Sequence, residues 1–262
     1  MDADWDNLII LDACRYDLFK EVNTIEGELS PVISKGSSTA EFLHRNFKTD
    51  DRTYGDSVYI SANPQNQKHG VKQYFHDSIP VWETEWDDNL RTVHPSDLTE
   101  QAIKISDQYP NKRLIVHYIQ PHYPFIGETG REIEHRSLHG FGALSDPRKA
   151  PPSVWTRLKN DEEVREHVWT AYQENLELTL PHIEQLIEEL EGKTVVTSDH
   201  GNALGRFELY GHPSKRFLKE LVEVPWLEID SNTRKTIEVG ETGGETEAGE
   251  AVNERLAYLG YK

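Results

Sequence analysis

The sequence predicts an α/β fold, a three-layer α/β/α sandwich with a mostly parallel central sheet. Three short apolar runs, at residues 8–11, 114–116 and 194–197, have the continuous hydrophobic character of strands that are buried on both faces. Stretches with apolar residues at helical spacing lie between these runs, and this alternation is typical of parallel sheets. With 262 residues, of which 36% are hydrophobic, the chain is long enough to bury a sizeable core.

Local signals set the bounds of the individual elements. Pro95, Ser96 and Asp97 form a helix cap ahead of apolar residues at helical spacing. Pro225 cannot donate a ladder hydrogen bond, so the strand that contains it is expected at or near a sheet edge. The predicted strands cover residues 8–11, 59–61, 114–116, 194–197 and 224–229. Two helices are predicted to begin, one within 34–43 and one at 95–97. Two further helices are predicted over 162–191 and 250–259.

The chain shows no internal repeat, and we expect one domain over residues 1–262. Glycine, proline and charged residues gather at 140–152 and at 240–249, which are predicted to be flexible loops. The longest apolar runs are only a few residues long, so no segment is expected to span a membrane.

Charge and cysteine content exclude several classes of function. The chain has 28 Lys and Arg against 46 Asp and Glu, a net charge of −18, whereas nucleic-acid binding needs a basic face. Cys14 is the only cysteine, which excludes an intrachain disulfide and a multi-cysteine metal site. The acidic N-terminus lacks the features of a secretory signal, so we expect a cytoplasmic protein. Such an acid excess is typical of salt-accumulating organisms, with an ordinary acidic enzyme as the alternative.

Polar residues directly after buried strands are the first candidates for a site, because ligands of open α/β sheets bind beyond the carboxyl ends of strands. The first apolar run ends in Asp12, and the run at 194–197 is followed by Ser198, Asp199, His200 and Gly201. Carboxylate and neutral imidazole together bind divalent cations. Each acid taken alone is equally well explained as a capping residue in a strand-end turn.

A hydroxyl cluster at Ser37, Ser38 and Thr39 stands at the expected start of a helix. Capping explains it locally, with Ser38 or Thr39 as N-cap and Glu41 in the first turn. Helix N-termini also receive anions, so a hydroxyl there is well placed to attack a phosphoryl or sulfuryl group. The sequence does not separate these two roles.

Five segments follow one another in a distinctive order. They are 8–17 with an Asp-x-x-Arg-x-Asp turn, 117–125 with Pro-His-x-Pro, 196–201 with Ser-Asp-His-Gly, 210–212 followed by 223–225 with Val-Pro, and 252–261. Together they resemble the sulfatase-like branch of the alkaline phosphatase superfamily, as an acidic, haloarchaeal member. The resemblance implies an alkaline-phosphatase-like fold over both ends and the middle of the chain.

The resemblance also implies one divalent metal ion held by Asp12, Asp199 and His200, with the nucleophile as a further ligand. Ser38 is the preferred nucleophile and metal ligand, followed by Thr39 and then Ser37. The family often has a proline two residues after its nucleophile, and Ala40 stands there instead. Manganese, zinc, magnesium and calcium all suit such ligands to differing degrees.

Further roles follow from the same resemblance. His122 and His212 are expected to act as catalytic residues that contact the substrate oxyanion or protonate the leaving oxygen. The same pair is the candidate for a second metal ion. Arg15, His117 and Lys215 are assigned to substrate binding.

Cysteine usage favours phosphate over sulfate esters. Secreted-type sulfatases use a cysteine in Cys-x-Pro-x-Arg, whereas Cys14 directly precedes Arg15. Cys14 also fails two other phosphatase patterns, because Lys20 stands where a thiolate phosphatase needs arginine, and Cys14 itself stands where a haloacid-dehalogenase phosphatase needs a second aspartate. We expect a metal-dependent hydrolase or transferase acting on a phosphate or sulfate ester of a small molecule, glycan or lipid headgroup. A catalytically silent metal- or ligand-binding protein with the same fold is the alternative, and the sequence leaves the oligomeric state open.

Overall fold

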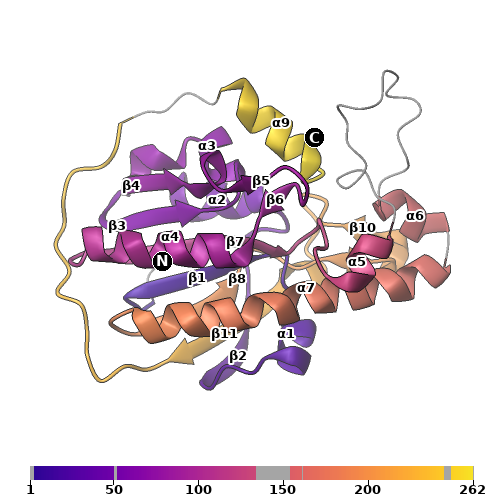
Figure 1. Cartoon of the computed structure of the whole chain (residues 1–262), viewed down its shortest axis with the longest axis horizontal. Helices are drawn as coiled ribbons and strands as arrows, with labels where there is room; N and C mark the ends of the chain where they lie inside the picture. Colours follow the sequence, from indigo (N-terminus) through magenta and orange to yellow (C-terminus); the bar gives the residue numbers. More distant parts are fainter. Residues whose placement is uncertain (1–2, 50–51, 134–153, 161, 245–248, 262) are drawn as a thin grey trace.

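The computed structural model of the chain describes residues 3–49, 52–133, 154–160, 162–244 and 249–261. A seven-stranded sheet forms its centre (Figure 1). β11 pairs antiparallel with β2 and with β8, and the other strand pairs of this sheet are parallel, so the predicted mostly parallel sheet is confirmed. The strand order is β2 (Glu28–Ile33), β11 (Glu223–Ile229), β8 (Thr194–Ser198), β1 (Asn7–Asp12), β7 (Arg113–Pro121), β3 (Tyr54–Ser61) and β4 (Phe75–Pro80).

The central strand β1 shows why the buried strands are continuous apolar runs. Ile9 and Leu11 belong to the hydrophobic core on one face of the sheet, and Leu8 and Ile10 belong to the core on the other. Successive side chains of a strand point to opposite faces, and here both faces are covered. Every residue of β1 is buried, including Asp12 at its carboxyl end.

Helices cover both faces, which confirms the predicted three layers. On one face, α1 (Tyr16–Val22), α4 (Pro95–Gln108) and α7 (Glu162–Glu189) share a core cluster with Ile9 and Leu11. On the other face, α2 (Thr39–Phe47) packs through Leu43 and Phe47 into the cluster that contains Leu8 and Ile10. Figure 1 shows α4 and α7 side by side across one face of the sheet.

Shorter elements surround this sandwich. The prediction for Pro225 agrees with the structure, because β11 lies one strand in from the edge strand β2 and Pro225 pairs with Pro31. The remaining elements are α3 (Gln65–Lys68), α5 (Glu128–Glu132), α6 (Val154–Asn160), α8 (Lys219–Val222), α9 (Glu250–Tyr258), the 3-10 turns Val71–Tyr74, Val81–Glu83 and Arg206–Glu208, and the two-stranded ribbons β5 (Trp86–Asp87) with β6 (Thr92–Val93) and β9 (Ala203–Leu204) with β10 (Tyr210–Gly211).

Of the two segments predicted as loops, the structure describes only part of the second. Residues 140–152 lie outside them. Residues 240–244 are described and follow the β3–β4 side of the sheet, where the Gly240 amide donates to Gly55 O and the Gly243 amide donates to Phe75 O, both at 2.8 Å. None of the described helices combines the length and apolar character that crossing a membrane requires.

Candidate metal and ester-binding site

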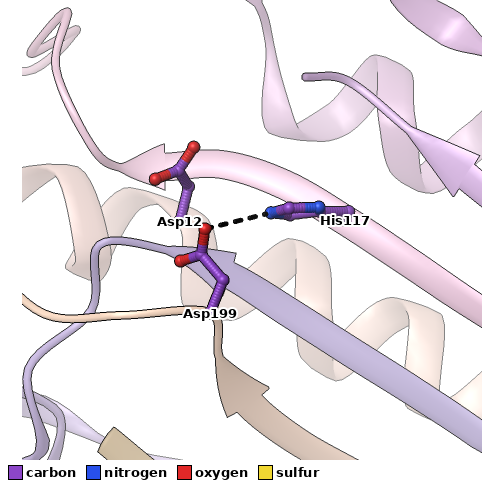
Figure 2. Close-up of side chains that lie close together, drawn as sticks. All are labelled: Asp12, His117 and Asp199. Carbon is purple, nitrogen blue, oxygen red and sulfur yellow. Dashed lines mark ion pairs between the residues drawn. The ribbon is translucent and has the colours of Figure 1, made fainter. Parts of the chain in front are cut away.

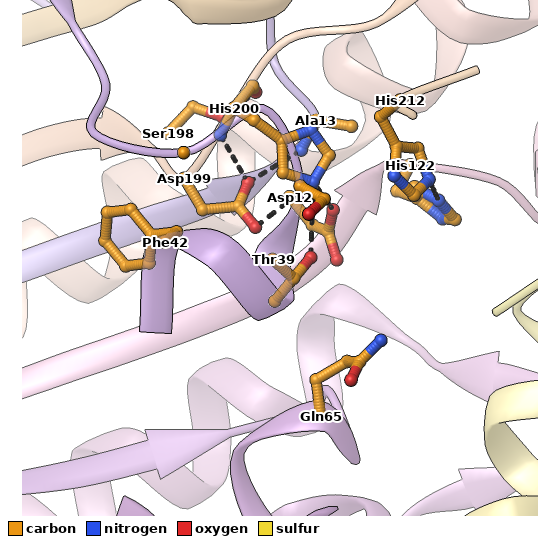
Figure 3. A network of polar contacts seen from close by, with 12 residues as sticks. Asp12, Ala13, Thr39, Phe42, Gln65, His122, Ser198, Asp199, His200 and His212 are labelled. Carbon is orange, nitrogen blue, oxygen red and sulfur yellow. Dashed lines mark hydrogen bonds and ion pairs between the residues drawn. The ribbon is translucent and has the colours of Figure 1, made fainter. Parts of the chain in front are cut away.

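Side chains from three elements meet at the carboxyl edge of the sheet (Figure 3). Asp12 ends β1, Asp199 and His200 follow the neighbouring parallel strand β8, and Thr39 is the first residue of α2. All four side chains are buried. The fold therefore brings together three predicted metal ligands and one of the predicted nucleophiles.

Each carboxylate uses one oxygen for structural hydrogen bonds and leaves the other free. Asp12 Oδ2 accepts hydrogen bonds from Asn63 Nδ2 at 2.6 Å and from the Tyr261 hydroxyl at 2.8 Å. Asp199 Oδ1 accepts two backbone amides from the strand-end turns, at 2.8 and 3.0 Å. Asp12 Oδ1 and Asp199 Oδ2 are buried without a hydrogen-bond partner among the described residues. Buried polar atoms normally have partners, so these two oxygens mark a place for a cation.

His200 brings one ring nitrogen to these two oxygens. Its Nδ1 donates to Gly201 O at 2.8 Å, which leaves the lone pair on Nε2. Nε2 lies 3.2 Å from Thr39 Oγ1, 3.4 Å from Asp199 Oδ2 and 3.5 Å from Asp12 Oδ1. A tetrahedral site with metal–ligand bonds of about 2.0–2.1 Å has ligand–ligand edges of about 3.3–3.4 Å. The three distances from His200 Nε2 are close to three of the six edges of such a site, and these four atoms are called the four-atom cluster below.

The turn after β8 depends on a glycine. A Cβ atom on Gly201 would lie 2.1 Å from Glu220 O, so the backbone approaches α8 more closely than any side chain allows. The Gly201 amide donates to Leu221 O at 2.8 Å, which fixes this approach. The glycine thereby sets the direction of the His200 ring next to it.

His117 of β7 lies beside the two carboxylates (Figure 2). Its ligand atom and those of Asp12 and Asp199 lie within 4.8 Å of one another, and its Nε2 is 3.9 Å from Asp199 Oδ2. Its Nδ1 is 2.8 Å from the Tyr59 hydroxyl, which is buried and makes no other hydrogen bond among the described residues. The hydroxyl therefore donates, and a neutral imidazole that accepts at Nδ1 carries its proton at Nε2. At 3.9 Å this nitrogen makes no hydrogen bond to Asp199, and it is buried without a partner among the described residues.

Burial controls the protonation of these groups. Burial raises the pKa of Asp12 well above its usual range, and the neighbouring Asp199 raises it further. Burial also raises the pKa of Asp199. Burial lowers the pKa of His117 and of His200 to about 4, so both rings are neutral at neutral pH. Two buried, mutually repelling carboxylates beside a neutral imidazole form an arrangement that a divalent cation stabilises.

The three candidate hydroxyls have different surroundings. Thr39 Oγ1 belongs to the four-atom cluster. Ser38 Oγ lies 2.8 Å from Ser214 Oγ, and Ser37 Oγ lies 2.8 Å from a carboxylate oxygen of Glu41. The structure thus brings Thr39, and not the preferred Ser38, against His200.

His122 and His212 form a pair next to the cluster. His122 Nδ1 donates to Tyr123 O, so its Nε2 is an acceptor. His212 Nε2 lies 2.8 Å from that atom and donates its proton to it. The ring centroids of His212 and His200 are 4.6 Å apart, which places this pair beside the candidate metal ligands. Burial lowers the pKa of both histidines well below the usual value, so both are neutral.

The structure brings neither Arg15 nor Lys215 into contact with the four-atom cluster among the described residues. Arg15 Nε donates to Asp17 Oδ1 at 2.8 Å, and Arg15 lines a cleft of about 650 Å³ together with Lys20 and Arg206. The side chain of Lys215 is exposed. His117 is buried and contacts Asp199, as described above.

Three residues of the site are not among the predicted ones. Asn63 donates to Asp12, and it follows β3 as Asp12 ends β1, so the strand-end pattern contained a signal for it. Tyr59 lies inside β3 and orients His117. Tyr261 has no local signal, because α9 brings it to the sheet from the other end of the chain.

Comparisons with known proteins identify solved structures that are similar to this chain. No protein-family model matches the chain, and no curated protein matches it. Solved structures do match. They include lipooligosaccharide phosphoethanolamine transferase A (EptA) from Neisseria meningitidis, with a TM-score of 0.59 and 16% identity over 88% of this chain and 49% of that one. This chain therefore spans about half the length of that transferase.

Two further structures come from other organisms. The C-terminal periplasmic domain of EcEptC from Escherichia coli, in complex with Zn, matches with a TM-score of 0.56 and 12% identity, over 88% of this chain and 74% of that one. A putative sulfatase from Bacteroides thetaiotaomicron matches with a TM-score of 0.53 and 12% identity, over 98% and 70%. At these identities the likeness shows the fold alone, and the expected α/β/α architecture with a mostly parallel sheet is confirmed.

Proposed function

We propose that the chain is a metal-dependent hydrolase or transferase of the sulfatase-like branch that acts on phosphate esters through Thr39. The observation that carries the proposal is the four-atom cluster, in which His200 Nε2 lies 3.2–3.5 Å from three oxygens of Thr39, Asp199 and Asp12. Two of these oxygens are buried without a hydrogen-bond partner among the described residues. The neighbouring structures support ester chemistry, since they are phosphoethanolamine transferases and sulfatases, and one of them is a zinc complex.

The residues of the site have two roles, to bind the cation and to react with the substrate. Asp12, Asp199 and His200 would hold one divalent cation, with Thr39 as the fourth ligand. When bound, the cation lowers the pKa of the threonine hydroxyl and neutralises charge on the transferred group. Thr39 is the first residue of α2, where the helix dipole also favours a negative charge.

The reaction then proceeds by in-line displacement. The Thr39 hydroxyl gives its proton to solvent as Oγ1 bonds to phosphorus and the ester P–O bond breaks. The proton that Thr39 gives up reaches the leaving oxygen through solvent, and His212, which His122 holds in place, stabilises the charge that develops on this oxygen. Water or an acceptor alcohol next attacks the phosphothreonine and restores the hydroxyl. Hydrolysis and transfer differ only in that acceptor. A second cation, if one binds, would take the place of the proton between the two histidines.

Phosphate esters are favoured over sulfate esters because the only thiol of the chain, that of Cys14, is not accessible to a substrate. Cys14 is fully buried, and burial raises its pKa well above the usual range. The substrate is expected to be a phosphate ester of a small molecule, a glycan or a lipid headgroup. The cytoplasmic location and the haloarchaeal origin stay predictions, and the descriptions of some neighbours name periplasmic domains.

The test is an assay of purified protein with an aryl phosphate, an aryl phosphodiester and an aryl sulfate, in concentrated KCl, with zinc, manganese, magnesium or calcium. We expect one phosphate ester to be cleaved, and we expect the activity to disappear in Asp199→Ala. Asp230→Ala is the matched control, because this carboxylate is exposed on the surface. If no ester is cleaved while metal still raises the melting temperature of the wild type, the proposal is wrong and the chain is a silent metal-binding protein.

A further inference from the structure

Tyr261 reaches the site from the far end of the chain. Its hydroxyl donates to Asp12 Oδ2 at 2.8 Å and lies 3.0 Å from Thr39 Oγ1. Its ring is stacked on His122, with centroids 5.3 Å apart and an interplanar angle of 7°. One side chain therefore contacts a candidate metal ligand, the candidate nucleophile and the histidine pair.

The end of α9 fixes the position of this tyrosine. Gly260 adopts a φ of 82°, and the Tyr261 amide donates to Leu256 O at 2.9 Å. A left-handed glycine with this amide contact is the C-terminal cap called a Schellman motif, and it sets the direction in which the chain leaves the helix. The apolar side of α9 packs into the main core through Val252, Leu256 and Leu259.

Side chains on the β5–β6 ribbon hold the exposed side of α9. The Arg255 guanidinium lies over the Trp86 ring at 4.8 Å and pairs with Asp88 at 2.9 Å. Arg91 lies over the Tyr258 ring at 4.4 Å. These contacts on two sides make α9 a rigid support for the residue that follows it.

The hydrogen bonds of the Tyr261 hydroxyl bear on the orientation of the Thr39 hydroxyl. A phenol has one proton, and Tyr261 gives that proton to Asp12. Its oxygen lies 3.0 Å from Thr39 Oγ1 and accepts from Asn63 Nδ2 at 3.4 Å. With a cation bound to Thr39 Oγ1 and His200 Nε2, the Thr39 lone pairs would face the cation and the Thr39 proton would be donated to Tyr261.

We propose that Tyr261 is a positioning residue that orients the Thr39 hydroxyl and Asp12 toward the bound cation. This role rests on the proposed function where Thr39 is concerned, whereas the contact with Asp12 concerns metal binding alone. Outer partners of metal ligands typically change metal affinity by about 10–100-fold when they are removed.

Tyr261→Phe tests the proposal because it removes the hydroxyl and keeps the ring on His122. Tyr258→Phe is the matched control, since it removes a hydroxyl from α9, the helix that precedes Tyr261, and this hydroxyl contacts only Glu254 among the described residues. We expect Tyr261→Phe to weaken Zn²⁺ affinity, measured by chelator competition, about tenfold. We also expect kcat to fall about tenfold while KM changes less than about twofold. Tyr258→Phe should leave all three values unchanged.

Two results would overturn the proposal. Unchanged Zn²⁺ affinity and kcat in Tyr261→Phe would show that the hydroxyl orients nothing. A higher kcat in Tyr261→Phe would show that the tyrosine obstructs Thr39 instead of orienting it. If the wild type cleaves no ester, the proposed function fails, and the Zn²⁺ measurement still decides whether Tyr261 supports Asp12.

Discussion

Ser38 and Thr39 are adjacent in the chain, yet their hydroxyls make contacts in different parts of the site. Ser38 Oγ lies 2.8 Å from Ser214 Oγ, whereas Thr39 Oγ1 lies 3.2 Å from His200 Nε2. Ser38 is the extended residue before α2, with φ −157° and ψ 157°, and Thr39 is the first helical residue. The change of backbone conformation between them turns their side chains apart.

Removal of each hydroxyl in turn gives the most direct test of which residue is the nucleophile. Thr39→Ala should lower kcat by about a thousandfold or more, because the attacking oxygen is removed. Ser38→Ala should keep kcat within about threefold of the wild type, since Ser38 contacts only Ser214 through its hydroxyl among the described residues. Steady-state kinetics on the same phosphate ester measures both. The opposite ranking would make Ser38 the nucleophile.

The metal should stabilise the protein more at high pH than at low pH. In the metal-free protein, the pKa of His200 is lowered from 6.5 to about 4, so this group contributes a loss of stability as pH falls from 6.5 toward 4. The raised pKa of Asp12 has the opposite sign, because it costs stability as pH rises above 3.8. A bound cation needs ionised carboxylates and neutral imidazole, so it relieves the cost that appears at higher pH.

Melting temperatures with and without Zn²⁺ between pH 5 and 8 measure this effect. At a free metal concentration about a hundredfold above Kd, we expect about 2.7 kcal/mol, or about 5–10 °C, near pH 8 and less at pH 5. His200→Ala should abolish the shift. An equal shift at every pH would contradict the assigned ligands.

Asp199→Asn should make the metal-free protein more stable and remove its response to metal. The asparagine keeps an oxygen for the backbone amides of Ala13 and His200, which donate to Asp199 Oδ1. Its amide nitrogen replaces the charged Oδ2 and ends the repulsion with Asp12. Thermal unfolding without metal should shift upward by about 2–4 °C, corresponding to about 1 kcal/mol. A lower melting temperature in the metal-free variant would contradict the view that these carboxylates repel one another.

Gly201→Ala should displace His200. The new Cβ would lie 2.1 Å from Glu220 O, so the backbone must move. We expect unfolding to need about 1–3 kcal/mol less free energy, measured by denaturant titration, together with weaker Zn²⁺ binding. Gly244→Ala is the control, because nothing lies within 4 Å of its Cβ position. Equal stability of the two variants would show that the turn after β8 relaxes freely.

Tyr59→Phe should destabilise the protein through His117. The substitution leaves His117 Nδ1 buried without its donor, which costs about 1–3 kcal/mol. The imidazole proton is then free to move to Nδ1, and nitrogen chemical shifts of the ring report this change of tautomer. Tyr258→Phe again serves as control, since its hydroxyl lies at the surface. An unchanged His117 tautomer in Tyr59→Phe would show that Tyr59 does not set it.

The parts of the site that follow from local sequence were predictable. Asp12 ends an apolar run, and Asp199 and His200 follow another, so the rule that ligands gather at strand ends finds all three. The same alternation of apolar runs and helical stretches gave the α/β/α sandwich. Burial of both faces imposes the continuous pattern of β1, and that pattern is visible without a structure.

The parts that depend on rotation or on distant packing were not predictable. The choice between Ser38 and Thr39 depends on where the extended backbone becomes helical, and one residue of difference decides which hydroxyl faces His200. Tyr261 is placed by the packing of α9 against the core and against the β5–β6 ribbon. Neither contact leaves a periodic or local signal in the sequence.

The position of β1 in the sheet also determines when this chemistry can first appear during synthesis. β1 is made before its two sheet neighbours, β7 and β8, which begin at Arg113 and Thr194. A growing chain emerges from the ribosome in sequence order, so β1 lacks one of its two neighbouring strands until β8 has followed. Any translation product that stops before β8 lacks both Asp199 and His200. An incomplete chain of this kind therefore lacks two of the residues that would hold the proposed cation.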